Sequence, residues 1–179
     1  MSLDTIKSAL PAFAKDLRLN LESVLSEGGA PGLSSLQIRA VALASAIASR
    51  HGPLTRAMEA FAAEQLEPAE IDGSRAAAAI MGMTNIYYRF THLASNKEYE
   101  TLRTSLRMNV MANPGLEKVA FEAASLAVSA VNGCGQCIDS HEKTLRQHGL
   151  TAQGVQSVVR IAAVVHAVAV TLEQSAASN

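Results

Sequence analysis

Long alanine-rich segments dominate this sequence and direct it toward a helical fold. Alanine has the highest helix propensity of all residues, and stretches such as residues 77–79 consist of alanine alone. Runs of β-branched residues are short and aromatic residues make up only 4% of the chain, so residues that favour strands are scarce. We therefore predict an all-α protein.

Apolar residues recur with helical spacing in eight segments. The predicted helices are Asp4–Val24 with a bend or new start near Pro11, Leu33–Arg50, Leu54–Leu66, Pro68–Tyr88, Tyr99–Met111, Pro114–Val131, Cys134–His148 and Thr151–Glu173. Asn113 followed by Pro114 is typical of a helix start, and His148 followed by Gly149 is typical of a helix stop. Thr151 is the expected cap of the last helix.

A weak internal repeat suggests two related halves. The segment Leu43–Ile47 resembles Leu126–Val131, and Ala77–Met81 resembles Ile161–Val165 at about the same offset. We predict one domain over residues 1–179, built from possible halves 1–96 and 97–179. The second half would carry the chemistry.

The charge balance argues against nucleic acid and membrane partners. Only 17% of residues are charged and the net charge is −1, so no basic surface is expected for nucleic acid or anionic lipid. The N-terminus lacks an apolar signal region, and the longest apolar run, Ile161–Val170, is interrupted by His166 and too short to span a bilayer. We expect a cytoplasmic protein.

Both cysteines of the chain lie in one short motif, Cys134-Gly-Gln-Cys137, with His141 four residues further on. If a helix begins near Cys134, all three side chains lie on one face. Such a pair can close a small disulfide, and the free N–H groups of a helix N-terminus favour thiolate over thiol. The motif predicts a reactive dithiol with His141 as its base.

Glu122 is the second candidate for this chemistry. Between Lys118 and Asp139 it is the only residue, apart from the cysteines, that can carry a full charge, and its neighbours are apolar. Glu122 either points to solvent or is a buried general base that relays protons. The second interpretation requires the chain to turn back near Asn132 and Gly133.

Simpler interpretations remain for each of these residues. The cysteines can be two buried apolar residues, or they can bind zinc together with His141 and a fourth ligand such as Glu122 or His148. The methionines Met81, Met83, Met108 and Met111 are expected to fill the core. We assign no chemistry to Tyr87, Tyr88 or Arg89, and we interpret His166 as a packing or interface residue.

Several segments resemble the alkylhydroperoxidase AhpD family, within the wider carboxymuconolactone decarboxylase-like group. They are Leu10–Pro11 with Ala14–Leu17, Ile80–Arg89, Leu106–Gly115, Phe121–Glu122 and Val128–His141, and together they extend over nearly the whole chain. The Cys-x-x-Cys-x-x-x-His pattern is shared by the wider group, whereas the central segments are similar to AhpD proper.

This resemblance implies an antioxidant enzyme of all-helical fold, assembled as a homotrimer. It implies a dithiol that reduces organic hydroperoxides, or regenerates the partner peroxiredoxin AhpC, with no tightly bound cofactor. The reductant would be a dihydrolipoyl group on a lipoylated acyltransferase, supplied by dihydrolipoamide dehydrogenase and NADH. Glu122, Cys134, Cys137 and His141 match the catalytic positions of the family.

We expect His141, polarised by Glu122 directly or through water, to deprotonate Cys137. Cys137 would then form the sulfenic acid. Cys134, expected to be the more exposed cysteine, would donate a proton and then resolve the sulfenic acid into the disulfide. Some family members have a histidine where this chain has Gln136, and a relay through that residue cannot operate here. A lactone decarboxylase and a zinc-binding regulatory protein are the alternative functions.

Overall fold

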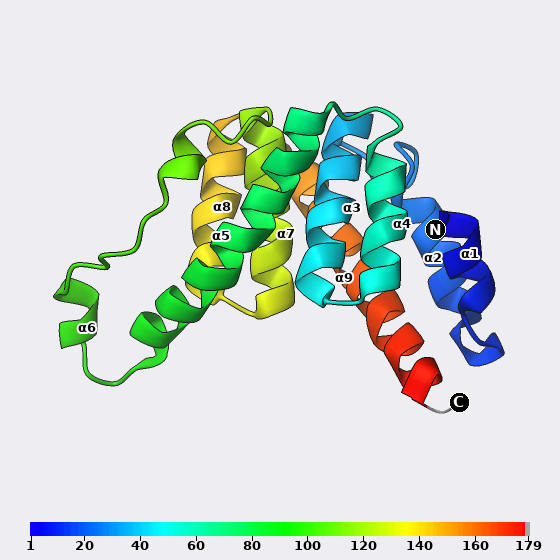
Figure 1. Ribbon diagram of the computed structural model, residues 1–179. Coiled ribbons are helices and arrows are strands. Elements are labelled where there is room, and N and C mark those ends of the chain that lie inside the picture. Colours follow the sequence, from blue (N-terminus) through cyan, green and yellow to red (C-terminus); the bar gives the residue numbers. More distant parts are fainter. Residues whose placement is uncertain (178–179) are drawn as a thin grey trace.

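The computed structural model describes residues 1–177, and within them the chain forms helices and no strand (Figure 1). The predicted all-α class is therefore confirmed. The α-helices are α1 Leu3–Ala9, α2 Lys15–Val24, α3 Ser35–Ser49, α4 Gly52–Ala62, α5 Pro68–Leu93, α6 Glu98–Thr101, α7 Lys118–Asn132, α8 Gly135–Gln147 and α9 Ala152–Ala177. Two short 3-10 helices, η1 Ala12–Ala14 and η2 Asn109–Ala112, complete the set.

Helices α3 and α7 form the centre of the molecule and pack side by side (Figure 1). Every residue from 38 to 46 of α3 is buried, and so are all residues from 120 to 129 of α7 except Glu122. Many of these residues are alanine, whose small side chain lets the two backbones approach closely. Helices α5 and α9 each contact both central helices, while α4 packs beside α3 and α8 beside α7. Glu122 is the one residue of this stretch of α7 that is only partly buried, and Arg39 is the charged residue within the buried stretch of α3.

The chain runs twice through the same succession of helices. Helices α3, α4 and α5 have 15, 11 and 26 residues, and α7, α8 and α9 have 15, 13 and 26. Both central helices end in a left-handed residue, Arg50 with φ 61° and Gly133 with φ 69°. These lengths agree with the expected duplication, which stays a prediction.

The segment between α5 and α7 differs from its prediction. The end of α5, α6 and the chain that follows project from the body as an arm before returning to it (Figure 1). The predicted helix Tyr99–Met111 is wrong, because only α6 and η2 are helical there. No residue from 92 to 115 is buried, and a short helix without a packed face is only marginally stable in water.

The start of α7 was also misplaced by the sequence pattern. Glu117, and not Asn113, caps this helix: its carboxylate accepts hydrogen bonds from the backbone N–H groups of Val119 and Ala120 at 2.9 and 3.0 Å. The predicted stop and start around α8 and α9 are confirmed. Gly149 is left-handed with φ 89°, and Thr151 accepts a hydrogen bond from the backbone of Gly154 at 3.1 Å.

Helix α9 is long and apolar enough to cross a membrane by length and composition alone. Half of its most apolar stretch is buried inside the protein, where α9 contacts α2, α3 and α7. Its apolar character is therefore that of a core helix.

Candidate active site

The turn between α7 and α8 brings the cysteine motif back against the core. Gly133 adopts the left-handed conformation that glycine tolerates best, and the backbone N–H of Cys134 donates to the carbonyl of Ser129 at 3.1 Å. The chain thus reverses where the relay hypothesis required it to. Cys134 is the N-cap of α8, and its Sγ accepts a hydrogen bond from the backbone N–H of Cys137 at 3.3 Å.

Cys134 and Cys137 form a disulfide in this structure. The expectation that Cys134 is the more exposed of the two is wrong: Cys134 is fully buried, while Cys137 is 6% exposed. The tight turn at Gly133 presses the cap residue against α7, whereas Cys137 lies one turn further along α8 and borders a cavity.

Glu122 and His141 form a direct contact between α7 and α8. The Oε2 atom of Glu122 lies 2.7 Å from Nδ1 of His141, and the side chains are only 15% and 10% exposed. A carboxylate accepts hydrogen bonds, so Nδ1 carries a proton, and whenever the ring is neutral Nε2 holds the lone pair. This pairing leaves Nε2 as the basic atom of His141.

Helix α5 supplies the neighbour of that basic atom. The Sδ atom of Met81 lies 3.2 Å from Nε2 of His141, and both side chains are buried. The hydroxyl of Thr84 is 3.6 Å from the same sulfur. Met81 therefore closes one side of the site with a thioether, which is only a weak hydrogen-bond acceptor.

A cavity of about 290 Å³ opens beside Cys137 and His141. Its walls come from α5, α8 and the returning end of the arm: Met81, Thr84, Tyr88, Met108, Met111, Gln136, Cys137, Ser140 and His141. The expectation that the methionines fill the core holds for Met81 but misses that it, Met108 and Met111 line this space. Tyr88, to which we assigned no chemistry, also borders the cavity. Its spacing of seven residues from Met81 is the sequence signal that places both on one face of α5.

The zinc hypothesis finds no ligand set in the part of the chain that the structure describes. No group of three or more His, Cys, Asp or Glu side chains gathers there in an arrangement that can hold a metal ion. His148, one of the suggested fourth ligands, is the C-cap of α8, about 20 Å from its N-cap at 1.5 Å per residue, and its Nδ1 contacts the carbonyl of Thr144.

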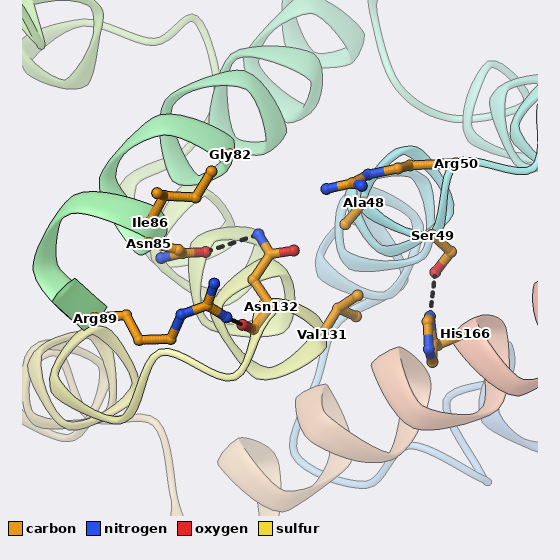
Figure 2. Close-up of a pocket in the computed structure, with 10 residues that line it drawn as sticks. All are labelled: Ala48, Ser49, Arg50, Gly82, Asn85, Ile86, Arg89, Val131, Asn132 and His166. Atoms are coloured by element: carbon orange, nitrogen blue, oxygen red, sulfur yellow. Dashed lines mark hydrogen bonds between the residues drawn. The ribbon is translucent and has the colours of Figure 1, made fainter. Parts of the chain in front are cut away.

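A larger cavity of about 450 Å³ lies at the C-terminal ends of α3 and α7 (Figure 2). Figure 2 shows Arg50 and Arg89 entering this space from different sides, and Arg89 donates a hydrogen bond to the carbonyl of Asn132 at 2.6 Å. Such a cation satisfies carbonyls that a helix end leaves free. The Ser49 hydroxyl in this lining lies 3.2 Å from Nδ1 of His166 (Figure 2), but it donates its own proton to the carbonyl of Ser45 at 2.7 Å. The lining holds no thiol or carboxylate, so we place the chemistry at the smaller cavity.

Comparisons with known proteins show the family of this chain. The model of the carboxymuconolactone decarboxylase family matches residues 97–178, which include the cysteine motif. Curated relatives named alkyl hydroperoxide reductase AhpD are 50% identical over 177 residues in Azorhizobium caulinodans, 51% over 178 in Rhodopseudomonas palustris and 50% over 173 in Brucella suis. Each alignment covers 97% or more of this chain and 96% or more of the relative. The chain therefore belongs to the AhpD family, within the carboxymuconolactone decarboxylase group.

Proposed function

We propose that this protein is a thiol peroxidase that reduces organic hydroperoxides through a cycle of Cys134 and Cys137. The observation that carries the proposal is the placement of Cys137 at a mostly apolar cavity, one helical turn before a histidine whose Nδ1 contacts a carboxylate that is largely shielded from solvent. An apolar cavity suits the hydrocarbon body of an alkyl hydroperoxide. The names of the relatives support the same activity.

The proposed first half of the cycle uses four residues. Nε2 of His141, with Glu122 holding Nδ1, takes the proton of the Cys137 thiol. The thiolate attacks the terminal oxygen of the hydroperoxide, the O–O bond breaks, and the alcohol leaves with a proton from Cys134. Cys137 is then a sulfenic acid. The Cys134 thiolate attacks the Cys137 sulfur, hydroxide leaves as water with the proton that His141 had taken, and the disulfide forms.

The burial of Cys134 supports its role as the resolving residue. Its sulfur faces the backbone N–H of Cys137 at the start of α8, where a thiolate is stabilised by the hydrogen bond and the helix dipole. A fully buried cysteine is a poor first nucleophile, because an incoming peroxide cannot reach its sulfur. It is well placed to attack a neighbour within the same turn.

We propose that a dihydrolipoyl group resets the disulfide. Its thiolate would attack Cys137, the sulfur that borders the cavity, and release Cys134 as the stabilised thiolate. A lipoylated acyltransferase with dihydrolipoamide dehydrogenase would supply the electrons, and the peroxiredoxin AhpC would be a second oxidised substrate. These partners rest on the resemblance to the AhpD family.

We also propose a cytoplasmic homotrimer. The projecting arm and the end of α5 expose an unusual number of large apolar side chains, namely Ile86, Phe90, Leu93, Tyr99, Leu102 and Val110. Exposed apolar surface of this extent is typical of subunit contacts. The family resemblance supplies the trimeric state.

Lactone decarboxylation is the second candidate, because the matching family model carries that name. Such a reaction does not need both thiols, whereas this chain pairs its two cysteines at the cavity. A double substitution of Cys134 and Cys137 by serine separates the two: the peroxidase loses its turnover and the decarboxylase keeps it.

The test of the proposed function is peroxide-dependent NADH oxidation with lipoamide and dihydrolipoamide dehydrogenase. We expect turnover by the native chain and none by Cys137→Ser. Omitting lipoamide should stop the native reaction too, because no other reductant of the disulfide is present. Turnover that survives in Cys137→Ser would contradict the proposal. If the native protein itself fails to turn over, oxidised AhpC is tested as the substrate in place of peroxide, and failure there as well would contradict the thiol cycle.

A further inference from the structure

Three thioethers line the cavity beside Cys137, and one of them touches the catalytic base. Met81, Met108 and Met111 all border this space, but only Met81 contacts His141. Met83, two residues further along α5, is not among the lining residues. Met81 therefore both lines the cavity beside Cys137 and contacts His141, the proposed base.

In its reduced form, the thioether of Met81 leaves His141 free to act. Nδ1 of His141 donates to Glu122, and Nε2 lies 3.2 Å from the Met81 sulfur, which can accept a hydrogen bond when Nε2 carries a proton. A thioether donates no hydrogen bond and accepts only weakly. It therefore excludes a stronger acceptor from Nε2 and stabilises a proton there only weakly, so Nε2 can lose that proton and act as a base.

We propose that Met81 is a peroxide-modified site that switches off the His141 base. This inference rests on the proposed function, which brings hydroperoxides into the cavity. In the disulfide form Cys137 has no thiol to offer a second hydroperoxide, and Met81 is then a reduced sulfur at the cavity wall. Oxidation at this point would stop an enzyme that receives more peroxide than reductant.

The chemistry is a two-electron oxidation of the thioether. The Met81 sulfur attacks the terminal oxygen of the hydroperoxide and a new S–O bond forms as the O–O bond breaks. The hydroperoxide proton passes to the departing alkoxide, so one sulfoxide and one alcohol are produced and the hydroperoxide is the oxidant. No further reactant is needed.

The product changes the partner of Nε2 from a weak acceptor to a strong one. A sulfoxide oxygen at this place accepts a hydrogen bond from an Nε2–H group, while Glu122 accepts from Nδ1–H. The ring is then held between two acceptors in its doubly protonated form, which cannot take the proton of Cys137. The enzyme stays inactive until the sulfoxide is reduced.

The test compares Met81 with Met83 on the same helix. The disulfide form of the full chain is exposed to cumene hydroperoxide, digested with trypsin and mapped by mass spectrometry. Both methionines fall in the peptide of residues 76–89, and fragment ions tell them apart. We expect oxygen on Met81 several-fold faster than on Met83, although Met81 is the more deeply buried. Equal or faster oxidation of Met83 would overturn the inference.

A second measurement links the modification to activity. Native protein, Met81→Leu and Met83→Leu are pre-exposed to hydroperoxide, re-reduced, and compared each with its own unexposed activity. We expect native protein and Met83→Leu to lose most of their activity and Met81→Leu to keep several-fold more. Loss at the native rate in Met81→Leu, or full native activity with Met81 oxidised, would overturn the switch. If Met81→Leu fails to fold, the test is whether the activity of the native protein falls as Met81 becomes oxidised. The peptide map does not depend on turnover, so it separates this inference from the proposed function.

Discussion

Two histidine–glutamate pairs each join two helices of this protein, and only one of them shares a cavity with a cysteine. His51 caps α4 and its Nδ1 lies 2.6 Å from Glu173 of α9. His141 lies on α8 and its Nδ1 is 2.7 Å from Glu122 of α7. The contact distances alone do not separate the two pairs.

Their surroundings do separate them. The Glu173 side chain is 64% exposed, so solvent screens that pair, and neither of its residues lines a described cavity. The Glu122 side chain is 15% exposed, and its histidine faces a cavity that also exposes Cys137. A carboxylate only 15% exposed, a cysteine one turn away and a cavity for substrate support our proposal that His141 is the base. The first pair ties α9 to the start of α4.

We expect the largest difference between the two pairs when their histidines are replaced and the peroxidase rate is measured. His141→Asn removes the proposed general base, and we expect the peroxidase rate to fall by about 10²- to 10⁴-fold. His51→Asn, the matched control, should leave the rate within a small factor of native. Steady-state rates in the lipoamide-coupled assay measure both. Equal losses in the two variants would mean that the difference in surroundings does not decide function.

We expect a smaller loss of peroxidase rate when the carboxylate of the second pair is replaced. Glu122→Gln keeps the shape of the side chain but removes the charge that orients and supports His141, so the rate should fall less than in His141→Asn. Glu173→Gln should leave the rate unchanged. The same assay decides, and a Glu122→Gln enzyme with native turnover would remove Glu122 from the relay.

The smallest effects are on stability, and they concern Arg50 and Gly133, the left-handed residues that precede the N-caps of α4 and α8. Gly133→Ala places a Cβ in a left-handed conformation, and we expect a loss of about 1 kcal/mol in the free energy of unfolding. In Arg50→Gly, relief of the same strain is offset by about 0.5–1 kcal/mol of extra unfolded-state entropy, so stability should change little. Urea denaturation followed by circular dichroism measures both. A Gly133→Ala protein with the same free energy of unfolding as the native protein would contradict the tight turn that buries Cys134.

Much of the helical frame was predictable from local patterns. Helix α8 was predicted as Cys134–His148, and the structure makes these two residues its caps. The shared face of Cys137 and His141 follows from their spacing alone, and Glu122 was identified as an isolated charge in an apolar helix. These features depend on residues within a few turns of one another.

The features that were missed depend on distant contacts. Cys134 was expected to be the more exposed cysteine because it is nearer the helix start, but the chain folds back at Gly133 and buries it completely. The predicted helix after α6 is absent because no residue from 102 to 115 is buried, so that segment has no fully packed face to stabilise it. The contact of Met81 with His141 joins residues 60 positions apart, which no local spacing reveals.

The central claim is that Cys137 meets the peroxide and Cys134 resolves the product. It is tested most directly by trapping the sulfenic acid. Cys134→Ser is treated with one equivalent of cumene hydroperoxide and then with dimedone, and the labelled cysteine is located by peptide mapping. We predict a dimedone adduct on Cys137, and no adduct on Cys134 when the same treatment is applied to Cys137→Ser. A sulfenic acid on Cys134 in the Cys137→Ser protein, with peroxide still consumed, would contradict the account.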